Sequence, residues 1–176
     1  MTARPAAIRV RPGAALRGTA RVPGDKSLSH RALILGALAE GVSHVRGWLP
    51  AGDTLATLGC VEALGVAVER ADVTTLTVCG RGLDGLRAPA APLSCGHAGT
   101  AMRLLAGVLA GQPFASTLDG SDQLRRRPMR RITGPLRQMG AQIADSGGHA
   151  PLHFSPAVLR GMVHTLPVAS AQVKSG

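Results

Sequence analysis

The stretch VPGDKSLSHRALIL, residues 22–35, joins a glycine turn, a polar cluster and a long apolar run. Proline and glycine at 23–24 indicate a turn, and the apolar run after them indicates a helix. Lys26 stands at the junction, and it is one of only two lysines in a chain with 18 arginines. Free N–H groups and the helix dipole make a helix start attractive to anions. The stretch therefore predicts a buried helix whose first turn can bind a phosphate or a carboxylate.

The same arrangement recurs twice further along the chain. Leu-Arg pairs at 16–17, 86–87 and 159–160 each precede an extended stretch, a turn of small residues and a helix start. The second start is GHAGTAMRLL at 96–105, and the third is ASAQVKS at 169–175. The spacing of about 70 to 75 residues is longer than a solenoid repeat. The chain therefore repeats one large supersecondary unit.

Each repeat follows the pattern βαβαββ, which predicts an α/β fold. In the first repeat we expect helices and strands, in chain order, at 27–41, 42–49, 53–65, 66–70 and 75–80 after an extended segment. In the second we expect them at 100–112, 114–120, 124–140, 141–146 and 152–155, again after an extended segment. The first helix of each repeat is apolar nearly all round and should be buried, whereas the second is amphipathic and should lie outside.

These patterns divide the chain into units at 16–85 and 86–158, with the start of a third at 159–176. Residues 1–15 form a separate N-terminal segment in this interpretation. The third unit stops just as its buried helix should begin, so we expect the chain to be a shortened one.

Composition favours a globular protein that binds small anions. The 176 residues are 45% hydrophobic, and the net charge is +10. Such a charge attracts nucleic acid, membrane surfaces or phosphorylated small molecules. The chain has no Tyr, two Phe and one Trp, so the stacking platforms of single-strand binders are missing, and no DNA-binding motif occurs. We therefore expect small anionic substrates and no nucleic acid.

Cysteine usage and hydropathy point to the cytoplasm. Cys60, Cys79 and Cys95 are scattered without a C-x-x-C pair, which is typical of reduced thiols. His97 lies close to Cys95, but no second ligand pair has usable spacing, so we expect no metal site. The longest apolar runs are near ten residues, too short for a membrane span, and no targeting segment occurs.

The helix starts supply the candidate binding residues. Lys26, Ser27 and Arg31 can together hold a phosphate or carboxylate, because Lys offers a point charge and Arg a planar pair of donors. Taken singly, Lys26 could be a solvated loop residue and Ser27 a plain N-cap. The second start adds Gly99, where backbone can approach a ligand, and Arg103, which needs an anionic partner if it is buried.

Two more candidates come from later in the chain. LRRRPMRR at 124–131 holds five arginines, and most of them should lie on a solvated helix face. Arg127 precedes Pro128, which disfavours helical backbone at Arg127, so we expect Arg127 at a helix start and in the site. The third start offers Ser170 and Gln172 for hydroxyl or phosphate recognition.

PGDKSLSHRALIL, GTAMRLL, RRRPM and ASAQVKS together resemble the 5-enolpyruvylshikimate-3-phosphate (EPSP) synthase family over about residues 8–175. The resemblance implies transfer of the carboxyvinyl group of phosphoenolpyruvate to the 5-hydroxyl of shikimate 3-phosphate, with release of phosphate. It implies addition and elimination through a tetrahedral intermediate in the shikimate pathway, without a metal or organic cofactor. It also implies two lobes of three βαβαββ units each, with buried helices whose N-termini face the cleft, the enolpyruvyl transferase fold.

Carried over motif by motif, the resemblance gives each candidate a role. Lys26 would be catalytic and touch both substrates. The expected shikimate 3-phosphate ligands are Lys26, Ser27, Arg31, Ser170 and Gln172. The expected phosphoenolpyruvate ligands are Lys26, Gly99, Arg103 and Arg127.

Two departures from the family pattern qualify the expectation. His97 stands where the family usually has Asn, in the loop where the family also binds glyphosate, so sensitivity to this herbicide is open. Family members exceed 400 residues, and residues 1–15 would pack with the far lobe. We therefore expect a partial site that is inactive without a C-terminal lobe. The alternatives are a non-catalytic substrate-binding fragment and a relative of the UDP-N-acetylglucosamine enolpyruvyl transferases.

Overall fold

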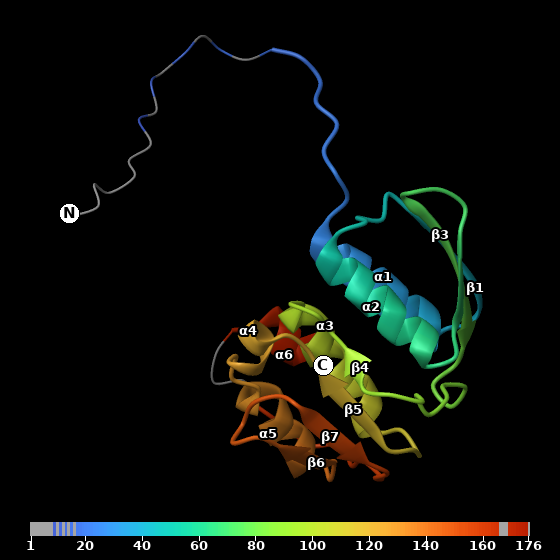
Figure 1. The fold of residues 1–176 in the computed structure, drawn as a ribbon, viewed down its shortest axis with the longest axis vertical. Helices are drawn as coiled ribbons and strands as arrows, with labels where there is room; N and C mark the ends of the chain where they lie inside the picture. Colours follow the sequence, from blue (N-terminus) through green and yellow to red (C-terminus); the bar gives the residue numbers. More distant parts are fainter. Residues whose placement is uncertain are drawn as a thin grey trace.

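The computed structural model describes residues 17–165 and 169–175, together with residues 9, 11, 13 and 15. Most of the segment 1–15 and the last residue, Gly176, therefore lie outside the described residues. Figure 1 shows two groups of helices and strands that follow one another in the chain. The first group contains helices α1 (Lys26–Leu38) and α2 (Gly52–Ala63) and strands β1 (Glu40–Arg46), β2 (Ala67–Arg70) and β3 (Thr75–Arg81).

The second group repeats this plan with one strand and one helix more. Its strands are β4 (Leu93–Ser94), β5 (Ser116–Asp119), β6 (Gln142–Asp145) and β7 (Leu152–Ser155). Its helices are α3 (Gly99–Ala110), α4 (Asp122–Arg125) and α5 (Arg130–Gln138). A short helix α6 (Ala171–Ser175) follows and packs on α3, which confirms that a helix begins in the third start.

The two sheets differ by one strand. The first has the order β1-β3-β2 and is antiparallel, whereas the second has the order β4-β5-β7-β6 with a parallel β4–β5 pair. The second repeat therefore follows the predicted βαβαββ order, except that two helices, α4 and α5, stand in place of its second helix. The strand expected before α1 is wrong, because residues 17–23 are all exposed and run away from β1 without a strand partner (Figure 1).

The helix expected over 124–140 is also wrong, because it is two helices. α4 ends at Arg125 and α5 begins at Arg130, with Pro128 between them. Proline lacks an amide hydrogen and disfavours helical backbone in the residue before it. Residues 126–129 therefore lie outside both helices, and Arg127 does not belong to a helix face.

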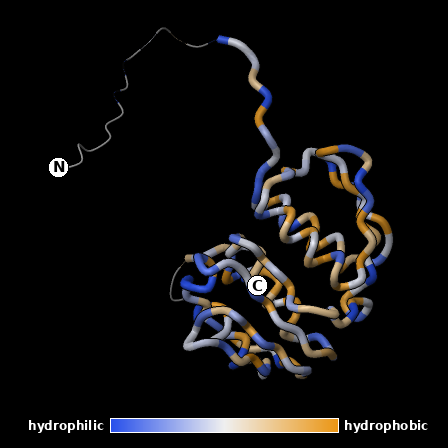
Figure 2. Tube along the Cα trace, in the orientation of Figure 1, coloured by the Kyte–Doolittle hydropathy of each residue, from blue (hydrophilic) through white to orange (hydrophobic). Residues whose placement is uncertain are grey.

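The first helix of each repeat was predicted to be buried, and this holds only for α3, in the second repeat. In α3 eight of twelve residues are buried. In α1 Leu33 is fully buried, but Leu28 and Leu35 are 68% and 64% exposed. The outer helices α2 and α5 each bury one face only, as predicted. Hydrophobic segments recur at intervals along α1 and α2 in Figure 2.

Both repeats contribute to one hydrophobic core. Leu33 and Leu58 from the first repeat and Leu105 and Phe154 from the second are at most 2% exposed and belong to the same cluster. Removing such side chains from water is the main force that holds the two repeats together. Among the described residues no helix is long and apolar enough to cross a membrane.

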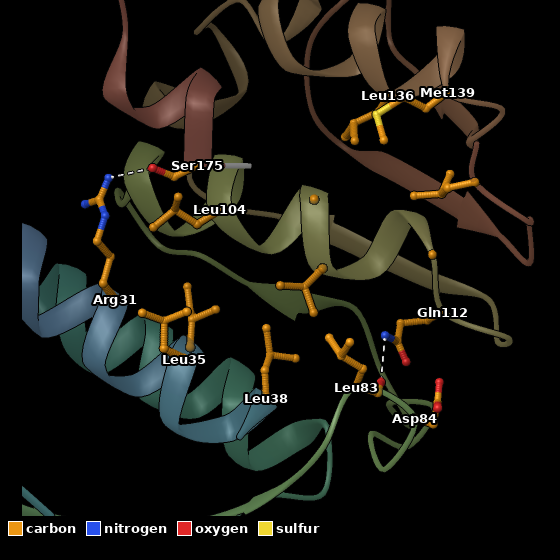
Figure 3. A pocket seen from close by; sticks show the side chains of 15 residues that line it. Arg31, Leu35, Leu38, Leu83, Asp84, Leu104, Gln112, Leu136, Met139 and Ser175 are labelled. Carbon is orange, nitrogen blue, oxygen red and sulfur yellow. Dashed lines mark hydrogen bonds between the residues drawn. The ribbon is translucent and has the colours of Figure 1, made fainter. Parts of the chain in front are cut away.

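A groove of about 660 Å³ lies between α1 and α3 (Figure 3). Leu35 and Leu38 line it from α1, and Leu104 lines it from α3. Arg31 and Ser175 lie at one end, where Arg31 Nη2 donates to Ser175 Oγ at 3.1 Å. The exposure of Leu35 is therefore part of an apolar groove between the two repeats.

Candidate functional site

Helix α1 begins at Lys26, and its cap is Asp25. The Leu28 amide donates to Asp25 Oδ1 at 2.7 Å. Ser27 is therefore not the cap, and within the described chain its hydroxyl makes no hydrogen bond. The start of α1 thus presents the Ser27 hydroxyl and the Lys26 ammonium, as a phosphate-binding helix start requires.

Lys26 pairs with an aspartate that the sequence reasoning missed. Lys26 Nζ lies 3.0 Å from Asp53 Oδ2, and these side chains are 52% and 28% exposed. Asp53 lies in the first turn of α2, where a carboxylate is favourable to the helix dipole. An aspartate in the first turn of a predicted helix was a signal that the sequence offered. Only the fold, however, shows that α2 places Asp53 beside Lys26. The pair is half-exposed, so the ammonium stays accessible to a ligand.

Two buried polar residues hold the start of α1 in place. Ser29 Oγ donates to the Asp25 carbonyl at 2.7 Å and accepts from the Leu49 amide at 3.0 Å. His30 Nδ1 hydrogen-bonds to Thr57 Oγ1 of α2 at 2.6 Å. Burial lowers the pKa of His30, so its neutral form is favoured. These contacts fix α1 against α2, and they thereby fix Lys26 near Asp53.

The second helix start carries a pair of arginines. A Cβ added to Gly99 would lie 2.8 Å from Arg103 Nη1 and 3.0 Å from Arg127 Nη1, so both guanidinium groups lie beside this residue. Arg103 donates to the Gly99 carbonyl at 3.2 Å and to the Pro128 carbonyl at 3.4 Å. The structure therefore brings together Gly99, Arg103 and Arg127, three of the four residues that the sequence analysis assigned to one ligand.

No carboxylate neutralises this arginine pair in the part of the chain that the structure describes. Burial, and then the charges of Arg127 and Arg131, lower the pKa of the Arg103 guanidinium. Two adjacent cations beside the N-terminus of α3 attract a small dianion strongly. The arrangement is thus suited to a carboxylate or phosphate.

The remaining arginines of the 125–131 cluster behave largely as surface residues. Arg125 pairs with Asp119 at 2.6 Å, and Arg130 donates to the Gly147 carbonyl at 3.3 Å. Arg131 is exposed, as predicted, and its charge also lowers the pKa of Arg103. Arg127 lies between α4 and α5 and not at a helix start, which corrects the prediction.

The third start contacts both of the others. Gln172 Oε1 accepts from Arg103 Nη1 at 3.1 Å, and Gln172 Nε2 donates to Thr100 Oγ1 at 2.8 Å. Ser170 Oγ accepts from the Val173 amide at 3.4 Å, as a cap of α6. Arg31 of the first start donates to Ser175 Oγ of the third at 3.1 Å. It lies one helical turn beyond Ser27 and also donates to the Ser27 carbonyl at 3.4 Å. Gln172 therefore holds Arg103, whereas Ser170 caps its own helix.

The glycine loop before α3 is fixed by the strand that follows α3. The Cys95 amide donates to the Asp119 carbonyl at 2.8 Å, and the Ser121 amide donates to the Gly96 carbonyl at 2.9 Å. His97 Nδ1 hydrogen-bonds to Ser121 Oγ at 2.8 Å. In the described parts of the chain, no group of three or more His, Cys, Asp or Glu residues could hold a metal ion.

Comparisons with known proteins agree on one family. The sequence model of EPSP synthase (3-phosphoshikimate 1-carboxyvinyltransferase) matches residues 10–176. The chain is 60% identical over 166 residues to a 3-phosphoshikimate 1-carboxyvinyltransferase of Acidithiobacillus ferrooxidans, covering 94% of this chain and 38% of the relative. It is 56% identical over 169 residues to the enzyme of that name from Halorhodospira halophila, covering 95% and 38%.

A solved structure shares the fold. The EPSP synthase of Acinetobacter baumannii matches with a TM-score of 0.85 and 47% sequence identity, over 90% of this chain and 36% of that chain. The chain thus spans about 38% of the length of the curated relatives that it matches.

Proposed function

The chain belongs to the EPSP synthase family, and from this premise we propose that it forms the substrate-binding part of a 3-phosphoshikimate 1-carboxyvinyltransferase. The reaction transfers the carboxyvinyl group of phosphoenolpyruvate to the 5-hydroxyl of shikimate 3-phosphate and releases phosphate. The observation that carries the proposal is the arginine pair. Arg103 and Arg127 lie beside Gly99 without a neutralising carboxylate in the described chain, and Gln172 contacts Arg103.

Phosphoenolpyruvate is the ligand that we assign to the arginine pair. It is a small anion with a carboxylate and a phosphate, and guanidinium groups bind both kinds of group with paired hydrogen bonds. The amides at the start of α3 add a favourable dipole. Because Gly99 has no side chain, it leaves the space in which both guanidinium groups and the ligand must lie.

Shikimate 3-phosphate is the ligand that we assign to the start of α1. The ammonium of Lys26, the hydroxyl of Ser27 and the guanidinium of Arg31 supply charge and donors for its phosphate. Gln172 of α6 and Ser170, the residue before α6, are proposed to contact the same substrate, although their described contacts are with the protein. Lys26 would then lie between the two anions and stabilise the charge that develops during addition.

The remaining parts of the site are proposed to come from a C-terminal lobe like that of the longer relatives. That lobe would supply the proton-transfer groups and the other half of the phosphoenolpyruvate site. We further propose that the reaction runs in the cytoplasm without a metal or organic cofactor. Glyphosate is a candidate competitor at the arginine pair, with His97 in the loop as the variable that decides its affinity.

Calorimetric titration of the purified chain tests the proposal. We expect saturable binding of shikimate 3-phosphate and none of shikimate, because the helix-start contacts need the phosphate. A Lys26→Met variant should lose most of this affinity, and an Arg70→Met variant, which removes a distant exposed arginine, should keep it. Equal binding of shikimate and its 3-phosphate would contradict the assignment.

Turnover separates the enzyme from a chain that only binds. We expect no carboxyvinyl transfer by this chain alone and measurable transfer after mixing with the C-terminal part of a relative. Binding without any recovered turnover would support the non-catalytic alternative.

A further inference from the structure

Two cysteines meet where the first repeat packs on the second. Cys60 lies on α2 and is 2% exposed, and Cys95 follows β4 and is fully buried. Helix α2 packs against β4, and Cys60 Sγ lies 3.5 Å from the carbonyl oxygen of Ser94, the neighbour of Cys95. Each thiol also shifts the pKa of the other, so the two side chains are neighbours. The third cysteine, Cys79, lies on β3 and is half-buried.

The two thiols of this pair are not equivalent. A surface cavity of about 400 Å³ is lined by Cys60, by its helix neighbours Ala56, Gly59 and Ala63, and by residues 90–94, but not by Cys95. The neighbouring Cys95 side chain lowers the pKa of the Cys60 thiol. The neighbouring Cys60 side chain, and then burial, raise the pKa of Cys95. Cys60 is thus both the reachable thiol and the better thiolate.

We propose that Cys60 and Cys95 form a modification site that a small-molecule disulfide converts into an intramolecular disulfide bond. The Cys60 thiolate attacks one sulfur of the reagent, and the other sulfur leaves as a thiolate. Cys95 then attacks the Cys60 sulfur, forms the Cys60–Cys95 bond and releases the second half of the reagent. The two protein protons end on the two released thiols, so the protein is oxidised by two electrons and one reagent disulfide is reduced.

The bond would connect α2 to the glycine loop of the candidate site. Cys95 begins this loop, since its amide donates to the Asp119 carbonyl and its carbonyl accepts from the Ala98 amide, each at 2.8 Å. Gly99 is the residue after Ala98. The modification site therefore lies at the start of the loop that leads to Gly99, but its chemistry does not depend on the proposed function.

Peptide mapping tests the proposal on the whole chain. Trypsin cleaves after arginine, so the three cysteines fall on separate peptides, 47–70, 71–81 and 88–103. The folded chain is treated with bis(2-hydroxyethyl) disulfide, free thiols are blocked, and the digest is analysed by mass spectrometry. We expect a linked pair of the peptides 47–70 and 88–103, with Cys79 blocked or carrying half of the reagent.

Three variants distinguish the order of the steps. Cys95→Ser should accumulate the reagent on Cys60, Cys60→Ser should leave Cys95 unmodified, and the control Cys79→Ser should form the bond like the natural chain. A digest in which the peptides 47–70 and 88–103 stay unlinked while Cys79 reacts would overturn the proposal. Links through Cys79, or modification of Cys95 in Cys60→Ser, would overturn it as well, and the unsubstituted chain gives the main result even if a variant fails to fold.

Discussion

Gly99 is the residue whose missing side chain makes room for the arginine pair. A methyl group there would lie 2.8 Å from Arg103 Nη1 and 3.0 Å from Arg127 Nη1, the ends of two flexible side chains. In Gly99→Ala these ends must move, whereas the backbone need not. We expect phosphoenolpyruvate affinity to fall about tenfold, or about 1.4 kcal/mol, while the free energy of unfolding changes by less than about 1 kcal/mol. Calorimetric titration and urea unfolding measure the two quantities.

Gly134 provides the matched control for this substitution. It lies on α5, and an added Cβ would have no atom within 4 Å. Gly134→Ala should leave phosphoenolpyruvate affinity unchanged. An equal loss of affinity in both variants would contradict the role of the space at Gly99.

His30 makes stability depend on pH. Burial lowers its pKa below the ordinary value of 6.5, so the unfolded chain binds a proton at this residue before the folded chain does. The free energy of unfolding should therefore decrease as the pH falls below about 6.5, by at most about 1.4 kcal/mol per pH unit for this one proton. His30→Asn should flatten that part of the curve, measured by urea unfolding across pH.

His44 serves as the comparison for the pH experiment. It is exposed on β1, whereas His30 is buried. His44→Asn should keep the slope of the natural chain. If the His30→Asn and His44→Asn curves coincide, the slope has another origin.

At the scale of single residues, the sequence predicted cations better than their partners. Lys26, Arg103 and Arg127 were identifiable because helix starts and Pro128 set their surroundings locally. Asp53 was not, because it meets Lys26 only when α2 packs against α1, 27 residues apart in the chain. Pairings of this kind depend on tertiary structure, which no local pattern contains.

Among the elements, α1 depends on its cap for its start. Asp25 accepts from the Leu28 amide, one of the amides that the helix itself leaves without a partner. Asp25→Ala should lower the free energy of unfolding by about 1 kcal/mol. Ser27→Ala, next to Lys26 but outside the cap, should change it by less than about 0.5 kcal/mol. Urea unfolding of both variants measures the difference, and a larger loss in Ser27→Ala would contradict the assignment of the cap.

The order of elements was largely predictable, and the exceptions have physical reasons. Hydrophobic periodicity placed α1, α2 and α3 and the strands from β1 to β7 close to their observed positions. Residues 17–23 were expected to form a strand because they precede a helix start, but a strand also needs a partner, and β1 pairs only with β3 in the described chain. Helix 124–140 looked continuous because its arginines suit a helix, yet Pro128 interrupts it.

At the scale of the whole molecule, the groove between α1 and α3 should be detectable in solution by dye binding. An exposed apolar groove binds hydrophobic dyes. We expect the folded chain to enhance the fluorescence of 8-anilinonaphthalene-1-sulfonate and Leu35→Glu to reduce this enhancement. Leu35 is 64% exposed, so the free energy of unfolding should stay within about 0.5 kcal/mol of the natural value.

Val73 is the control for the groove, because it is 73% exposed in the turn between β2 and β3, away from the residues that line the groove. Val73→Glu should leave the dye signal unchanged. An equal reduction by both substitutions would show that the dye binds elsewhere.

The hydrogen bond between Gln172 and Arg103 also sets an order of events during protein synthesis. The two residues are 69 positions apart. At about 5–20 residues per second, a ribosome needs about 3–14 s to proceed from one to the other. Arg103 is in the nascent chain throughout that interval, and Arg127 joins it 24 residues after Arg103, still before the amide that later holds Arg103. A small anion in the cell therefore meets the arginine pair before the glutamine does.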